Sequence, residues 1–226
     1  MCNAACLAWG EKNLASAEVK GKRVLELGAY IVNGSLRAQV EALEPAEYVG
    51  TDIRPGPGVD LVCPAEDLPL QFGCDSFDIV IATCLLEHTR RWQAVVSSMK
   101  RLCKPQGLVL VIVPSIWPFH AYPNDYWRYT AADLRHIFAD FELLQMAQDA
   151  AAPSLAYAKL RKPALFTEVD LAAYPLYSII TNRRTTQIRP ADFLSLRFAG
   201  LALQCAVTHT WELLARWYRS MSLSGR

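Results

Sequence analysis

Several polar residues of this 226-residue chain directly follow short apolar runs, where a ligand could reach them. Glu26 and Gly28 close the first run, and Asp52 closes the second. If the runs are parallel strands, their carboxyl ends share one crevice. A carboxylate 24 residues past the first glycine is then placed to accept hydrogen bonds from both hydroxyls of a ribose. The spacing therefore predicts a nucleoside site.

The loop after Gly28 limits which nucleoside can bind. A dinucleotide requires glycines at GxGxxG spacing, so that the backbone can approach the pyrophosphate. The loop here reads Gly28-Ala29-Tyr30-Ile31-Val32-Asn33-Gly34, without the middle and final glycines of that motif. A ligand with an amino-acid end in place of phosphates demands less of the loop, and its ammonium group can lie near Glu26. S-adenosylmethionine has both features.

Six short motifs follow one another along the first two thirds of the chain. They are Val24–Gly28, Gly50–Ile53, Ala65–Pro69, Phe77–Val80, Leu86–His88 and Leu102–Gly107. In this order and spacing they resemble the motifs of class I S-adenosylmethionine-dependent methyltransferases of the type 11-like group, over about residues 20–160. The resemblance implies S-adenosyl-L-methionine as the cofactor and S-adenosyl-L-homocysteine as the product.

The resemblance also implies which residues hold the cofactor. The methionine portion is assigned to the start of the glycine loop, the ribose to the end of the second strand, the adenine to the segment after the third, and the floor beneath the methyl group to the end of the fourth. Pro64 stands where many members have an acidic residue, so Glu66 takes that part. The expected cofactor-binding residues are Glu26, Gly28, Asn33, Gly34, Asp52, Ile53, Ala65, Glu66, Thr83 and Cys84.

Candidates for a general base lie in the loops after the fourth and fifth predicted strands. In methyl transfer from a sulfonium the protein chiefly orients the acceptor, but a hydroxyl acceptor must also lose a proton. The candidates are His88, His120 and Asp125. Six aromatic residues between positions 117 and 129 suit a stacking, hydrogen-bonding acceptor such as a sugar or an aromatic ring. A structural role stays the alternative for each, and Arg128 can pair with Asp125 to lock the loop.

Two further segments narrow the expected acceptor. Asn33–Arg37 and His120–Arg128 resemble a subgroup of bacterial and archaeal enzymes often linked with glycan or cell-surface biosynthesis. We therefore expect methyl transfer to a small molecule or a glycan, with oxygen as the favoured atom. Two alternatives stay open. One is methylation of protein or nucleic acid through the basic tail, although no Asn/Asp-Pro-Pro-Tyr motif follows the fourth strand. The other is a non-catalytic S-adenosylmethionine-binding subunit, since the glycine loop is degenerate.

The elements that must position these residues alternate along the chain. Nearly all-apolar runs predict strands buried on both faces, and the segments between them have helical spacing. We expect an α/β fold with a doubly wound, Rossmann-like, seven-stranded and mostly parallel sheet, followed by a helical C-terminal extension. The predicted strands are 23–28, 48–53, 59–62, 77–82, 108–113, 141–146 and 155–160. The predicted helices are 36–43, 92–102, a helix from a capping box at Thr130 and Asp133 through Phe138, and one or two helices over 191–219.

Composition bounds the remaining function classes. The chain is 52% hydrophobic and 20% charged with a formal charge of +1, so disorder and dominant polyanion binding are disfavoured, and no nucleic-acid partner is expected. The near-zero net charge is the sum of two unlike parts: residues 1–150 carry a net charge of −5 and residues 151–226 a net charge of +6. We predict a cofactor-binding domain over 1–162, and an extension over 163–226 that covers the acceptor pocket or makes a homodimer contact.

The seven cysteines are scattered, and no signal peptide precedes them, which indicates reduced thiols in a cytoplasmic protein. No apolar run reaches the roughly 18 residues of a membrane-spanning helix. Cys2 and Cys6 supply only half of a structural zinc site, and no CxxC or histidine pair nearby completes it. We therefore expect no metal, and an N-terminal helix over the cofactor cleft with two small buried thiols.

Overall fold

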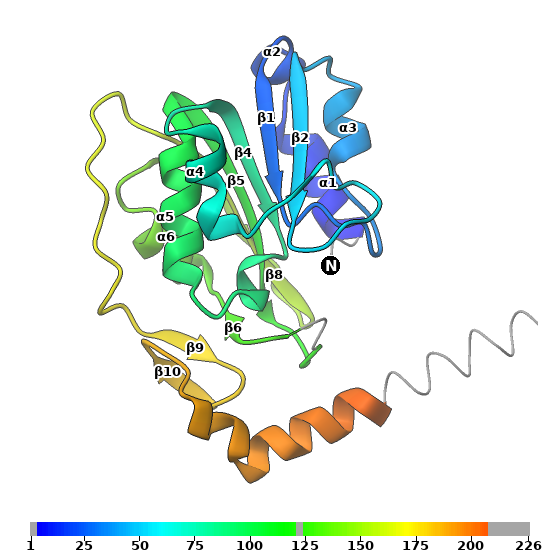
Figure 1. Cartoon of the computed structure of the whole chain (residues 1–226), viewed down its shortest axis with the longest axis vertical. Coiled ribbons are helices and arrows are strands. Elements are labelled where there is room, and N and C mark those ends of the chain that lie inside the picture. Colours follow the sequence, from blue (N-terminus) through cyan, green and yellow to red (C-terminus); the bar gives the residue numbers. More distant parts are fainter. Residues whose placement is uncertain (1–3, 121–123, 208–226) are drawn as a thin grey trace, which may run out of the picture.

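A seven-stranded sheet forms the centre of the protein, of which the computed structural model describes residues 4–120 and 124–207 (Figure 1). The strand order is β3-β2-β1-β4-β5-β8-β7. The strands are β1 (Arg23–Leu27), β2 (Glu47–Asp52), β3 (Leu61–Val62), β4 (Phe77–Thr83), β5 (Cys103–Ile116), β7 (Glu142–Gln148) and β8 (Ser154–Arg161). Strands β1 to β5 pair in parallel, and β8 runs antiparallel to both β5 and β7. The predicted doubly wound, mostly parallel sheet is thereby confirmed.

Helices cover both faces of this sheet because side chains alternate along its strands. In β4, Ile79 and Ile81 pack in one core cluster with Val40. Val80 belongs to the opposite cluster together with Val95. Helices α4, α5 and α6 lie on the second face, and α1 and α3 on the first (Figure 1). The helices are α1 (Ala4–Asn13), α2 (Ser16–Val19), α3 (Arg37–Glu41), α4 (Leu68–Phe72), α5 (Trp92–Leu102) and α6 (Ala131–Ile137).

The observed ends of the strands differ from the predicted ends mainly where pairing with a neighbouring strand, rather than local amino-acid composition, determines them. Helix α5 occupies the predicted residues 92–102. Strand β5 extends beyond the predicted 108–113 at both ends, because Cys103 pairs with β4 and residues up to Ile116 pair with β8. Strand β3 is confined to Leu61–Val62, since only two of its residues meet β2. Local apolar runs therefore locate the strands but do not set their ends.

The predicted capping box at the start of α6 is present. The Thr130 hydroxyl accepts a hydrogen bond from the Asp133 amide at 3.2 Å, and the Asp133 carboxylate accepts one from the Thr130 amide at 2.8 Å. We expect Thr130→Ala to lower the free energy of unfolding by about 1 kcal/mol, because a helix N-terminal amide loses its acceptor. Thr130→Ser keeps that acceptor and should remain near wild type. Urea denaturation of the two variants checks this, and equal stabilities would contradict it.

A second, smaller sheet was not predicted and joins the extension to the main domain. It pairs β6 (Trp127–Arg128) with β9 (Leu176–Ser178) and β9 with β10 (Arg183–Thr185). The extension thus begins as irregular chain and a β-hairpin. It becomes helical at η3 (Pro190–Leu194) and over residues 196–207 (Figure 1). The remainder of the predicted 191–219 helical segment lies outside the described residues, as does Cys2.

The role of the extension stays a prediction. Four large apolar side chains of its described helical part are exposed, namely Leu194, Leu196, Leu203 and Val207, which leaves the predicted homodimer contact open. The domain boundary at 162 also remains a prediction. Within the described residues, no helix combines the length and apolarity required to cross a bilayer.

Candidate active site

One cavity lies at the carboxyl ends of β1, β2 and β4, as the sheet topology requires. It measures about 1070 Å³, counted out to its open mouth. Nine of the ten predicted cofactor residues line it: Glu26, Gly28, Gly34, Asp52, Ile53, Ala65, Glu66, Thr83 and Cys84. Asn33 is exposed and is not part of this lining. Sequence separates these residues by up to 58 positions, and the parallel strand order brings them together.

Glu26 is a buried carboxylate at the inner end of the cavity. Its side chain accepts hydrogen bonds from the Tyr48 hydroxyl at 2.5 Å and, at 3.5 Å, from the hydroxyls of Ser35 and Thr83. Burial raises the pKa of Glu26, and these hydrogen bonds together with the nearby Arg37 only partly offset the rise. A cationic ligand group beside Glu26 would therefore gain a buried counter-charge.

Asp52 ends β2 at the position predicted for a ribose-binding carboxylate. One of its oxygens accepts a long hydrogen bond from the Tyr30 amide at 3.4 Å, and the other accepts one from the Arg54 amide at 3.2 Å. A carboxylate has about four lone-pair sites, so acceptor capacity remains for ligand hydroxyls. The backbone contacts fix the orientation of Asp52 toward the cavity that it lines.

Two residues with left-handed backbone conformations shape the cavity floor. Gly28 has φ +74°, and a Cβ there would lie 3.0 Å from a Leu85 methyl group, so glycine suits both the conformation and the space. Cys84 has φ +51° although it is not glycine, which places local strain at the end of β4. Hydrogen bonding with Cys6 and burial raise the pKa of the Cys84 thiol well above its ordinary value. The thiol is therefore a neutral part of the floor.

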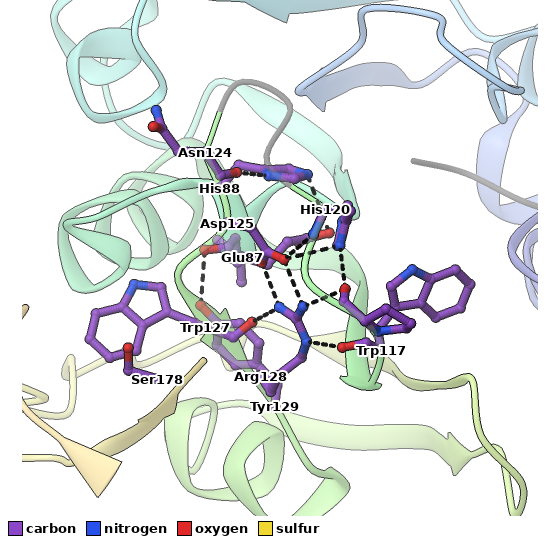
Figure 2. Close-up of polar contacts among 12 residues, drawn as sticks. Glu87, His88, Trp117, His120, Asn124, Asp125, Trp127, Arg128, Tyr129 and Ser178 are labelled. Atoms are coloured by element: carbon purple, nitrogen blue, oxygen red, sulfur yellow. Dashed lines mark hydrogen bonds and ion pairs between the residues drawn. The ribbon is translucent and has the colours of Figure 1, made fainter. Parts of the chain in front are cut away.

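The predicted base candidates divide into two groups. His88 lines the cavity, and the His120 ring meets it edge to face with ring centroids 5.2 Å apart (Figure 2). Asp125 is 1% exposed and is not among the lining residues. The Arg128 guanidinium donates hydrogen bonds to the two Asp125 oxygens at 2.5 and 2.7 Å. The His120 amide donates a third hydrogen bond to Asp125 at 2.9 Å. The structure thus brings the two histidines together and places Asp125 behind them.

The ion pair with Arg128 determines the protonation of Asp125. Burial alone would raise the pKa of Asp125, but hydrogen bonds from Arg128 and His120 outweigh that effect and hold the pKa well below its usual range. The carboxylate is therefore ionised near neutral pH and has both oxygens engaged. Arg128 also donates to the carbonyl oxygens of Trp117, Pro118 and Trp127. The predicted pairing of Arg128 with Asp125 is thereby confirmed.

None of the five described aromatic residues of this segment lines the cavity, and two of them hold the backbone in place. The Tyr129 hydroxyl donates to the Leu86 carbonyl at 3.1 Å, and the Trp127 ring nitrogen donates to the Thr89 carbonyl at 3.0 Å. Both side chains are fully buried. They fasten the segment to η2 (Leu86–His88), the turn that carries His88. Tyr122 lies outside the described residues, and its predicted contact with an acceptor stays a prediction.

Sequence reasoning missed several residues of the site. Tyr48 lies inside β2 and reads as an ordinary strand residue, yet its hydroxyl binds Glu26. The alternation along β2 places it on the same face as Gly50, which offered a signal. Glu87 was recognised only as part of a motif, and its side chain is completely buried beside His88.

Comparisons with known proteins agree with this geometry. The family model described as "Methyltransferase domain" matches residues 4–151. The chain therefore belongs to the methyltransferase domain family, which confirms the predicted class of S-adenosylmethionine-dependent methyltransferases and its cofactor. No curated protein sequence matches the chain.

Solved structures share the fold at low sequence identity. One is the Burkholderia thailandensis 1,6-didemethyltoxoflavin-N1-methyltransferase with bound 1,6-didemethyltoxoflavin and S-adenosylhomocysteine, at TM-score 0.58, 17% identity, and coverage of 71% of this chain and 80% of that chain. Another is an S-adenosylmethionine-dependent methyltransferase from Mesorhizobium loti, at TM-score 0.54, 14% identity, and coverage of 71% and 99%. The [4+2]-cyclase SpnF is similar at TM-score 0.56, 14% identity, and coverage of 71% and 82%. These likenesses concern the fold.

Proposed function

We propose that the chain methylates a hydroxyl oxygen of a small molecule or a glycan. The observation that carries this proposal is the cavity in which Glu26, Asp52 and His88 line one space at the carboxyl ends of the strands. Two carboxylates suit the two ends of the cofactor, and a histidine stands where an acceptor proton must leave. The neighbour that acts on 1,6-didemethyltoxoflavin lends support to a small-molecule acceptor.

The residues present fit the cofactor. Burial raises the pKa of Glu26, and an ammonium group beside it would favour the ionised carboxylate. Asp52 retains lone pairs for two ribose hydroxyls. We assign the methionine end to Glu26, Gly28 and Gly34, and the adenine to Ala65 and Glu66. When bound, S-adenosylmethionine supplies a methyl group activated on a sulfonium sulfur.

The residues around the acceptor have separate tasks in this proposal. His88 and His120 mark the place where the acceptor proton is lost, because His88 lines the cavity and the His120 ring contacts the His88 ring. Asp125 is proposed as a positioning residue that holds His120 through its backbone amide and ring. The bound acceptor must displace water from this end of the cavity for the transfer to be efficient.

Two further observations support the proposed acceptor class and location. Arg184 of the basic extension pairs with buried Asp133 at 2.5 Å, so part of its positive charge serves the fold rather than a polyanion. Free thiols on Cys63, Cys74, Cys84, Cys103 and Cys205 are typical of a reducing compartment, in keeping with a cytoplasmic enzyme.

Calorimetric titration of the full chain with S-adenosylmethionine and S-adenosylhomocysteine tests the proposal. We expect both to bind, and Asp52→Ala to weaken binding about tenfold or more, because hydrogen bonds to a charged acceptor are lost. Asp170→Ala, which changes an exposed carboxylate of the extension, serves as the control. Absence of binding by either compound would overturn the assignment. Binding without turnover on a panel of glycans and phenols would favour a non-catalytic subunit.

A further inference from the structure

Three potential metal-ligand side chains lie close together beside the cavity, and no sequence motif predicts this cluster. Glu87 and His88 belong to η2, and His120 comes from the loop after β5 (Figure 2). One ligand atom from each lies within 4.8 Å of those of the other two. Two imidazoles and a carboxylate are a donor set typical of first-row divalent metal sites, such as the His₂Glu zinc site.

The Glu87 carboxylate is the feature of this cluster that most requires a partner. The residue is 0% exposed, and within the described part of the chain neither carboxylate oxygen has a hydrogen-bond partner. An ionised carboxylate buried in this way is costly unless it is paired or coordinates a metal. Its Oε1 lies 3.6 Å from His88 Nε2, so the oxygen points into the cluster. A cation at this point would offset the cost of burial.

The hydrogen bonds of the two histidines leave the same ring nitrogen available. His88 Nδ1 contacts the carbonyl oxygen of Asn124. His120 Nδ1 lies 3.0 Å from the Pro118 carbonyl oxygen and 3.1 Å from Asp125 Oδ2. These oxygens can only accept, so each Nδ1 donates, and each neutral ring carries its lone pair on Nε2.

This arrangement is the one that metal-binding histidines commonly show. Such histidines donate their other ring N–H to a carboxylate or a backbone carbonyl, which fixes the ring orientation and the tautomer. Asp125 supplies the carboxylate here and is itself held by two hydrogen bonds from Arg128. The support behind His120 is therefore built from buried residues, which distinguishes the cluster from a chance meeting of surface side chains.

We propose that Glu87 and the Nε2 atoms of His88 and His120 bind one divalent transition-metal ion, with zinc as the reference ion. Ligand atoms about 2.1 Å from zinc lie roughly 3.4 Å apart in a tetrahedral site, so binding draws the side chains together. Three protein ligands leave one position open. Its use by the acceptor rests on the proposed function: a hydroxyl bound there, next to the cavity that His88 lines, would lose its proton more readily.

Zinc calorimetry on the full chain, stripped with a chelator and free of S-adenosylmethionine, tests the site. We expect one equivalent of Zn²⁺ to bind, and Glu87→Gln, His88→Gln and His120→Gln each to weaken binding tenfold or more. His136→Gln is the matched control, because His136 is exposed on α6 and stacks on Tyr174, with ring centroids 4.1 Å apart. Visible spectra of the Co²⁺ form should show nitrogen and oxygen ligands without a thiolate band.

Two results would overturn the inference. One is the absence of a zinc equivalent, and the other is zinc binding that none of the three substitutions weakens. An ion pair between His88 and Glu87 that needs no metal would give the first result. If Glu87→Gln does not fold, His120→Gln decides, because the His120 ring lies nearer the surface, with 15% of its side chain exposed. Cofactor binding is measured separately, so each proposal can fail alone.

Discussion

Asp125→Ala is expected to lower the free energy of unfolding by about 3–5 kcal/mol, because it leaves the Arg128 guanidinium buried without its counter-charge. Arg128 is 4% exposed and donates hydrogen bonds to both carboxylate oxygens of Asp125. Its remaining hydrogen bonds to three backbone carbonyls cannot neutralise the charge. Urea denaturation at neutral pH measures the loss.

A double-mutant cycle separates the ion pair from simple loss of packing. Asp125→Ala combined with Arg128→Met should cost less than the sum of the single changes, because no buried charge is left unpaired. The exposed pair of Arg161 and Glu142, 3.4 Å apart, provides the control, and Glu142→Ala should change stability by less than about 1 kcal/mol. Additive single effects in the cycle would count against the argument.

The pH dependence of stability follows from the same ion pair. The pKa of Asp125 is lower in the folded protein than in the unfolded chain. Its contribution to the free energy of unfolding is therefore fully present at pH values above the unfolded pKa of about 3.9. That contribution is lost as the pH falls from there toward the folded pKa. The wild type should therefore lose stability more steeply in acid than Asp125→Ala. If both proteins lose stability equally steeply in acid, another carboxylate dominates the pH dependence.

The sequence predicted most of the residues that line the cavity, because the order of parallel strands largely determines where the strand ends lie. Once β1 and β2 are recognised, Glu26, Gly28 and Asp52 must converge at one edge of the sheet. The capping box of α6 could also be predicted from the sequence, because its two residues are only three positions apart. In both cases the signal is local or is fixed by strand order.

What the sequence could not show depends on contacts between distant segments. His88 and His120 are separated by 32 positions, and their meeting depends on how the segment after β5 folds back over η2. Strand β6 has two residues and pairs with β9 some 50 positions away, so no periodicity marks it. Asp125 was predicted as a base because it stands near His120 in the sequence, and the spacing could not show that both its oxygens accept hydrogen bonds from Arg128. Side-chain direction within a loop is not encoded in spacing.

Glu26→Gln is expected to weaken S-adenosylmethionine binding about 30- to 100-fold, or by about 2–3 kcal/mol, because the ammonium group loses a buried charged acceptor. Glutamine keeps the shape and one oxygen of Glu26, so the cavity should stay intact. Calorimetry measures the affinity, and Glu11→Gln, on the exposed surface of α1, is the matched control. Unchanged affinity would mean that Glu26 does not meet the ammonium group.

The same substitution should leave the ligand-free protein at least as stable as the wild type. Burial raises the pKa of Glu26, so this group stabilises the fold when it is protonated, and that contribution is lost as the pH rises through the folded pKa. At neutral pH the folded wild type must either bury an ionised carboxylate or take up a proton that the unfolded chain does not hold, a cost that glutamine avoids. Stability should therefore fall with rising pH more steeply in the wild type than in Glu26→Gln.

A marked loss of stability in the variant would show instead that the hydrogen bonds from Tyr48, Ser35 and Thr83 outweigh the desolvation of the carboxylate. If the variant is stable but binds the cofactor weakly, the cavity retains a destabilising charge because the ligand requires it.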